Sequence, residues 1–151
     1  EARTTFHFTA DGITPAMAAQ MPEGKGSRYQ TTYKDKDGNY LYGDKSYKLN
    51  IPGNVPAQDF WSVVAYDPQT RSELQTGQPY PSRNNKRDNL NANPDGSVDL
   101  YFGPKLPDGA PKSNYLRTVP GKGWFTLLRL YSPKKAFFDK TWRPGDFEKL
   151  K

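Results

Sequence analysis

The chain contains no cysteine and only one histidine, His7. Without cysteine, disulfide bonds, thiolate nucleophiles and cysteine-ligated metals are excluded. A Ser-His-Asp triad and most zinc sites would both have to use His7. Its neighbours Phe6 and Phe8 point to the opposite face of an alternating segment, so we interpret His7 as a packed or solvent-facing side chain. We therefore predict no metal site and no cofactor.

Long apolar runs are also missing. No stretch approaches the roughly 18 apolar residues of a membrane helix, so no membrane span is predicted. The sequence shows no secretory signal and opens on Glu1 rather than on a methionine. We interpret this as a mature or fragment N-terminus, with a removed signal or an upstream domain before it.

The composition is polar but rich in aromatic residues. Only 34% of the 151 residues are apolar, which resembles a disordered chain, yet 14% are aromatic, which does not. We expect an aromatic core with long polar loops. The length fits one domain over residues 1–151.

The positive charge is concentrated in the last third of the chain. Of the formal net charge of +6, residues 101–151 contribute most, with 11 basic and 4 acidic side chains. An anionic partner such as nucleic acid would explain this, but no basic-and-aromatic binding motif accompanies the charge. A solvated basic face is the favoured interpretation, and nucleic-acid or anion binding is the weakest functional hypothesis.

Short alternating segments predict an all-β chain. In residues 97–102 and 124–131, apolar side chains occupy one face, and the other face carries polar or aromatic ones. Further strands are expected at 4–8, 29–34, 39–42, 46–51, 60–66, 73–76 and 115–119. The run at 60–66 is apolar throughout, as in a strand buried on both faces. We predict a jelly-roll-like β-sandwich with a short N-terminal helix at 14–21 and an extended C-terminal tail after a helical turn.

Three loops need a separate interpretation. Residues 35–38 resemble a calcium loop, but glycine is fourth and Ser46 is twelfth, so we predict a hairpin turn. Residues 120–123 are predicted to join 115–119 to 124–131 as a hairpin, which is no phosphate-binding loop because no helix follows. Residues 77–96 form a long polar loop of a kind that is often functional or mobile.

Six segments together resemble a bacterial family, the domain of unknown function 1214. They are GITPAM (12–17), DFWSV (59–63), YDPQTRS (66–72), DGSVDLYFGP (95–104), PGKGWF (120–125) and FDKTWRPGD (138–146). One departure is that residues 83–88 read RNNKRD where we expect a serine-rich stretch after Pro81 and Ser82. Any function of that loop can therefore differ here.

The resemblance implies more than the residues alone do. It implies a jelly-roll-like sandwich that is the C-terminal part of a two-domain protein, with the domain of unknown function 1254 upstream. It also implies a periplasmic or secreted location. It implies no activity, because none is assigned to the family.

Asp99 and Arg129 are the most informative polar candidates. Both are expected in mid-strand on the outward face, with Tyr101 and Tyr131 beside them. We predict that the two charges form an ion pair, since half-buried charge on a sheet usually finds a partner. Alternatively, Asp99 is one of two catalytic carboxylates of a glycan or amide hydrolase, whose second member the sequence does not identify.

Aromatic side chains next to polar groups suggest a surface for carbohydrate-like ligands. The candidates for ligand binding are Tyr80, Asp99, Tyr101, Arg129, Tyr131 and Trp142. The competing interpretation, which we favour, is ordinary core together with an interface to the upstream domain. The leading hypothesis is thus a non-catalytic structural or ligand-binding module, and the alternative is the hydrolase.

Overall fold

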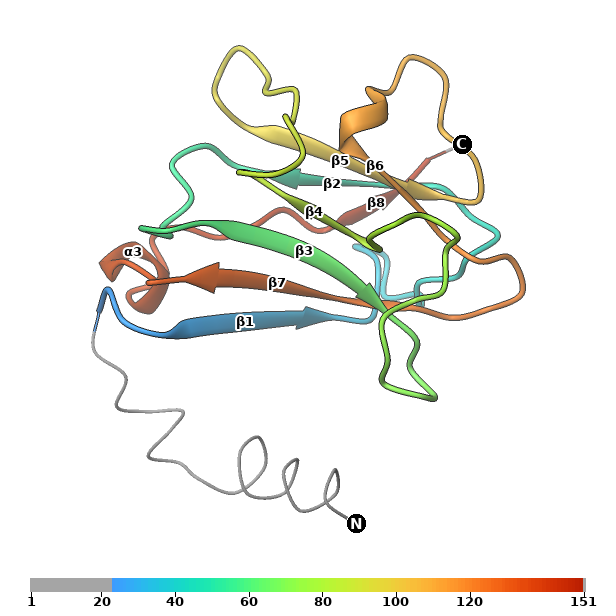
Figure 1. Ribbon diagram of the computed structural model, residues 1–151, viewed down its shortest axis with the longest axis horizontal. Helices are drawn as coiled ribbons and strands as arrows, with labels where there is room; N and C mark the ends of the chain where they lie inside the picture. The colour runs from blue at the N-terminus through green and yellow to red at the C-terminus, as the bar shows by residue number, and fades with distance from the viewer. Residues whose placement is uncertain (1–22, 151) are drawn as a thin grey trace.

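The computed structural model describes residues 23–150 and is mostly β (Figure 1). Two four-stranded sheets make up the fold: sheet A, with strand order β1-β7-β3-β4, and sheet B, with order β6-β5-β2-β8. The strands of sheet A are β1 (Ser27–Thr32), β3 (Trp61–Tyr66), β4 (Ser82–Asn84) and β7 (Phe125–Tyr131). Those of sheet B are β2 (Tyr47–Ile51), β5 (Val98–Gly103), β6 (Tyr115–Arg117) and β8 (Phe147–Lys149). Two short helices, η2 (Lys112–Asn114) and α3 (Lys135–Phe138), lie in the connections.

The all-β prediction is confirmed for this part of the chain. The strands expected at 46–51, 60–66 and 97–102 are β2, β3 and β5. The strand expected at 4–8, the helix expected at 14–21 and His7 lie outside the described residues. No helix within residues 23–150 is long and apolar enough to cross a membrane.

The inward faces of both sheets share one hydrophobic core. Leu49, Leu100 and Phe102 from sheet B pack in the same cluster as Val63 and Leu130 from sheet A. Aromatic rings fill its centre, where Phe102 stacks on Trp124 at 5.2 Å between ring centroids. Successive residues of β3 are buried on both faces, since Val63 and Val64 are 0% and 3% exposed. The two sheets are therefore held together by the apolar side chains that their strands direct into the shared core.

The turn predicted at 35–38 is confirmed, but it does not join two strands: β1 pairs with β7, and Lys34 and Tyr40 form only an isolated bridge. Asp35 Oδ1 accepts hydrogen bonds from the backbone nitrogens of Asp37 (3.1 Å) and Asn39 (2.9 Å). Gly38 adopts a φ of 82°, which favours glycine. The carboxylate thus stabilises the turn. The segment expected as a strand at 39–42 makes only isolated bridges, one of them between Tyr42 and Gly123.

The hairpin predicted around residues 120–123 is wrong. β6 pairs in parallel with β5 in sheet B, whereas β7 lies between β1 and β3 in sheet A. The turn instead carries the chain from one sheet to the other and packs on Gly43, whose backbone nitrogen donates to Lys122 O at 2.8 Å. A Cβ on Gly43 would stand 1.9 Å from Val119 O, so only glycine permits this approach.

The extended tail also differs from its prediction. The helical turn is confirmed as α3, but the residues after it do not stay unpaired. β8 pairs antiparallel with β2, with Phe147 opposite Leu49 and buried in the core. The end of the described chain is therefore the edge strand of sheet B, next to β2.

Candidate functional site

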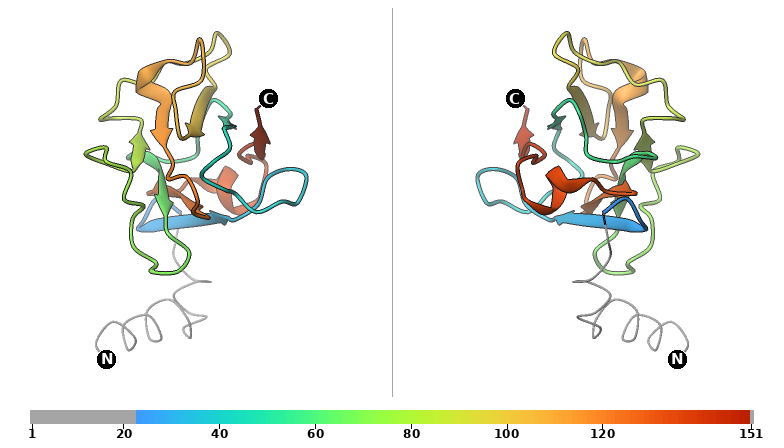
Figure 2. Two further views of the ribbon diagram at one scale, coloured as in Figure 1. Left: turned by 90° about the vertical axis from the view of Figure 1, so that its right-hand side faces the viewer. Right: turned by 90° about the vertical axis from the view of Figure 1, so that its left-hand side faces the viewer.

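The six residues predicted for ligand binding do not come together. Asp99 and Tyr101 face outward from β5 in sheet B, whereas Arg129 and Tyr131 face outward from β7 in sheet A. In both views of Figure 2, β1 of sheet A and the β5–β6 region of sheet B lie at opposite ends of the molecule. The hydrophobic core separates the two outer faces, so they cannot form one site.

The predicted ion pair between Asp99 and Arg129 is wrong. Asp99 Oδ1 instead accepts a hydrogen bond from Asn50 Nδ2 at 2.7 Å, across the β2–β5 pair. The alternation correctly places both charges on outward faces. It does not indicate which strands share a sheet, and that decides which charges can meet.

Arg129 lies between two tyrosine rings on sheet A. Its guanidinium carbon is 5.4 Å from the ring centroids of both Tyr29 and Tyr131. Partial burial acts to lower the pKa of Arg129, but Tyr131, Tyr29 and Tyr66 outweigh it and the pKa is raised. The side chain is therefore a fixed cation on an aromatic surface.

Further rings extend this surface over most of sheet A. Phe60 stacks on Tyr131 at 4.0 Å, and Phe125 stacks on Tyr33 at 4.7 Å and on Tyr66 at 5.4 Å. We call this surface the aromatic face. Its members are Tyr29, Tyr33, Phe60, Tyr66, Phe125, Arg129 and Tyr131. Only Arg129 and Tyr131 were among the predicted site residues, because the others become neighbours through strand pairing.

Trp142 has a largely structural position. It is 9% exposed, belongs to the core cluster, and donates from Nε1 to Gly53 O at 3.2 Å. It also borders a groove of about 800 Å³ beside β1, where Arg28 and Phe138 form a cation–π contact at 5.7 Å. Its ring face is thus mostly unavailable to a ligand.

Tyr80 lies in the long loop before β4 and is 56% exposed. Arg87 stacks over its ring, with 4.2 Å between the guanidinium carbon and the centroid. Both border a small cavity that Arg83 also lines. The prediction missed both arginines, and the only signal for them was the basic departure from the expected serine-rich stretch at 83–88.

Several carboxylates in the described part of the chain are engaged in local structure. Asp67 accepts hydrogen bonds from the backbone nitrogen of Gln69 and from Lys122 Nζ, and these hold its pKa below the usual range. Asp88 pairs with Arg87 at 2.8 Å. Within residues 23–150 no group of three or more His, Cys, Asp or Glu side chains could hold a metal ion.

These features define a two-sheet, all-β domain whose outer surface carries an aromatic face and a small basic cavity. The chain belongs to the family described as "Protein of unknown function (DUF1214)", whose model matches residues 26–135. The resemblance found in the sequence is thereby confirmed.

At least two solved structures share this fold. The VPA0106 protein from Vibrio parahaemolyticus is 22% identical, with a TM-score of 0.71 over 83% of this chain. An uncharacterised protein from Burkholderia cenocepacia is 18% identical, with a TM-score of 0.53 over 82% of this chain. The matches cover only 31% and 29% of those two chains. No curated protein matches the chain.

Proposed function

We propose that this chain is a non-catalytic module whose aromatic face packs against an upstream domain of the same protein. The observation that carries the proposal is that six tyrosine and phenylalanine rings and Arg129 lie together on one outer sheet surface. Tyrosine, phenylalanine and arginine are the residues enriched in protein interfaces, where buried aromatic anchors supply most of the binding energy. Tyr29, which is 50% exposed, would gain most from being covered.

The identity of the partner domain, the export of the whole protein and the fold variant are proposed from the family. The chain spans about a third of the length of the two solved relatives, which leaves room for a further domain. The family resemblance favours the domain of unknown function 1254 as that partner, an exported protein as the whole, and a jelly-roll variant as the fold. The parallel β5–β6 pair would be a departure from an antiparallel jelly roll.

A second candidate for the same face is a carbohydrate-like ligand. The half-exposed ring of Tyr29 lies next to Arg129, so a stacking surface and a hydrogen-bond donor are adjacent. This combination suits a sugar, which offers an apolar face and hydroxyl acceptors. No observation in the described residues favours the hydrolase, for which the sequence supplied only Asp99 as a candidate carboxylate.

The test is to produce the upstream region as a separate polypeptide and titrate it into this chain by calorimetry. Binding should weaken by about tenfold or more in Tyr29→Ala and Arg129→Ala, as expected for interface anchors. The matched control is Tyr101→Ala, on the outer face of sheet B, which should bind normally. A reading frame without an upstream region, or equal loss in the control, would contradict the proposal. Saturable binding of oligosaccharides that Tyr29→Ala abolishes would favour the sugar ligand instead.

A further inference from the structure

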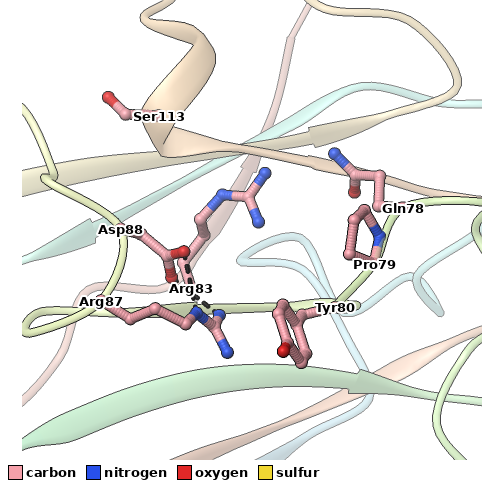
Figure 3. Close-up of a pocket in the computed structure, with 7 residues that line it drawn as sticks. All are labelled: Gln78, Pro79, Tyr80, Arg83, Arg87, Asp88 and Ser113. Carbon is pink, nitrogen blue, oxygen red and sulfur yellow. Dashed lines mark hydrogen bonds and ion pairs between the residues drawn. The ribbon is translucent and has the colours of Figure 1, made fainter.

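A small cavity lies between η2, strand β4 and the segments directly before and after β4 (Figure 3). Its volume is about 310 Å³, at the lower end of the range for small-molecule sites. The residues that line it are Gln78, Pro79, Tyr80, Arg83, Arg87, Asp88 and Ser113. None of the outward residues of the aromatic face lines it, so this cavity is independent of the function proposed above.

One of its two arginines is already neutralised. Arg87 donates from Nε to Asp88 Oδ1 at 3.0 Å and from a terminal nitrogen to Asp88 Oδ2 at 2.8 Å. Its plane also covers the ring of Tyr80. This bidentate pair makes Arg87 and Asp88 a neutral wall of the cavity.

Arg83, in contrast, has no carboxylate partner of this kind among the described residues. It donates to the backbone carbonyls of Ser82 and Tyr115, but it forms no ion pair with a carboxylate in residues 23–150. Its Nε is buried without an acceptor. Burial lowers the pKa of Arg83, with Asp88 acting against this shift and Arg87 acting with it. A half-buried cation whose hydrogen bonds go only to backbone carbonyl oxygens is costly, and an external anion would offset that cost.

The cavity supplies a second donor and an apolar wall. The Gln78 side-chain oxygen accepts a hydrogen bond from the backbone nitrogen of Arg117 at 2.8 Å. This fixes the amide, whose nitrogen lies on the side toward the Arg83 guanidinium in Figure 3. Pro79 and the ring of Tyr80 provide apolar surface on the same side of the cavity.

We propose that this cavity binds a small organic carboxylate, with the Arg83 guanidinium as its anchor, the Gln78 amide as a second donor, and Pro79 and Tyr80 against its apolar part. Arg83 is the one arginine of the cavity lining that forms no ion pair with a described residue, and a single such charge matches a monoanion better than a doubly charged phosphate. The planar guanidinium fork also matches the two oxygens of a carboxylate.

The experiment follows the Arg83 Nε–H signal of the ¹⁵N-labelled chain by NMR while sodium benzoate is added. The proposal expects a saturable shift of that signal and a rise in melting temperature with benzoate. Inorganic phosphate at the same ionic strength should bind more weakly. The absence of a saturable shift up to the solubility limit of benzoate would overturn the proposal, and phosphate binding as tight as benzoate would overturn its carboxylate specificity.

Two variants locate the site. Arg83→Met keeps an unbranched apolar stem without the guanidinium and should weaken benzoate binding by about tenfold or more, since charge-assisted hydrogen bonds are lost. Lys86→Met removes one positive charge from the turn directly after β4, outside the cavity lining, and should bind like the wild type. Equal loss in both variants would reduce the effect to net charge and contradict the site. The Arg83 Nε–H signal is read on the unchanged chain, so the test holds even if Arg83→Met does not fold.

Discussion

Both sheets have alternating inward and outward side chains, but their outer faces carry different kinds of residue. On sheet B, outward polar groups pair across neighbouring strands, as Asn50 does with Asp99 at 2.7 Å and Lys48 with Glu148 at 3.9 Å. On sheet A the outward positions carry stacked rings around Arg129. Sheet B thus satisfies its own polar groups, whereas sheet A keeps apolar ring area in contact with water and gains when a partner covers it.

The largest expected loss of stability comes from truncating an inward side chain of sheet B, compared with its outward neighbour. Phe102→Ala should cost about 3–5 kcal/mol of unfolding free energy, because Phe102 is fully buried against Trp124. Tyr101→Ala, one residue earlier on the outward face, should cost less than about 1 kcal/mol. Urea denaturation of both variants measures the difference. Similar losses would mean that the outer face of sheet B contributes to stability like a core.

Double-mutant cycles should show that the two outer faces are independent. Asp99→Ala combined with Arg129→Ala should be additive to within about 0.5 kcal/mol, because the charges belong to different sheets. Asp99→Ala combined with Asn50→Ala should instead show a coupling of about 0.5–2 kcal/mol, from the hydrogen bond between them. A substantial coupling of Asp99 to Arg129 would show that the two outer faces are not independent.

The smallest expected effect on stability is the pH dependence due to Asp139, which lies at the end of α3 and on neither outer face. Asp139 accepts hydrogen bonds from Lys135 Nζ at 2.8 Å and from the hydroxyl and backbone nitrogen of Thr141, which lower its pKa to about 2. A lowered pKa stabilises the fold above the pKa of the unfolded chain, near 4, and this contribution is lost as the pH falls toward about 2.

Melting temperatures of the wild type and Asp139→Asn, measured from about pH 5 down to about pH 2, check this sign. The wild type should lose more on acidification than the variant, which lacks the titrating carboxyl. Parallel curves for the two proteins would show that Asp139 adds nothing to the pH dependence.

The inward and outward positions could be predicted from sequence because they follow from local alternation. Tyr47, Leu49 and Ile51 are all buried, as their spacing predicts. Strand pairing could not be predicted, because the glycine-rich turn at 120–123 serves a hairpin or a crossover equally well. The approach of Val119 to Gly43, far away in sequence, accompanies the crossover seen here.

For the candidate site, too, the direction of a side chain could be predicted, but its neighbours on other strands could not. That Arg129 and Tyr131 face outward could be read from β7 alone, but their neighbours Tyr29 and Phe60 come from β1 and the segment before β3. Arg83 was missed for a related reason. Its importance depends on which arginine pairs with Asp88 and on what surrounds the Arg83 Nε, and neither is encoded in the spacing of the loop.

The pairing of the first described strands with the last ones has a consequence for how the chain folds. β1 pairs with β7, and β2 pairs with β8. Each sheet therefore joins early and late segments, and neither can close before the C-terminal quarter has been synthesised. Such non-local pairing delays folding and leaves strand edges open meanwhile. On a ribosome or in a translocation channel, the two sheets should thus stay incomplete, and in need of chaperone protection, until β7 and β8 have emerged.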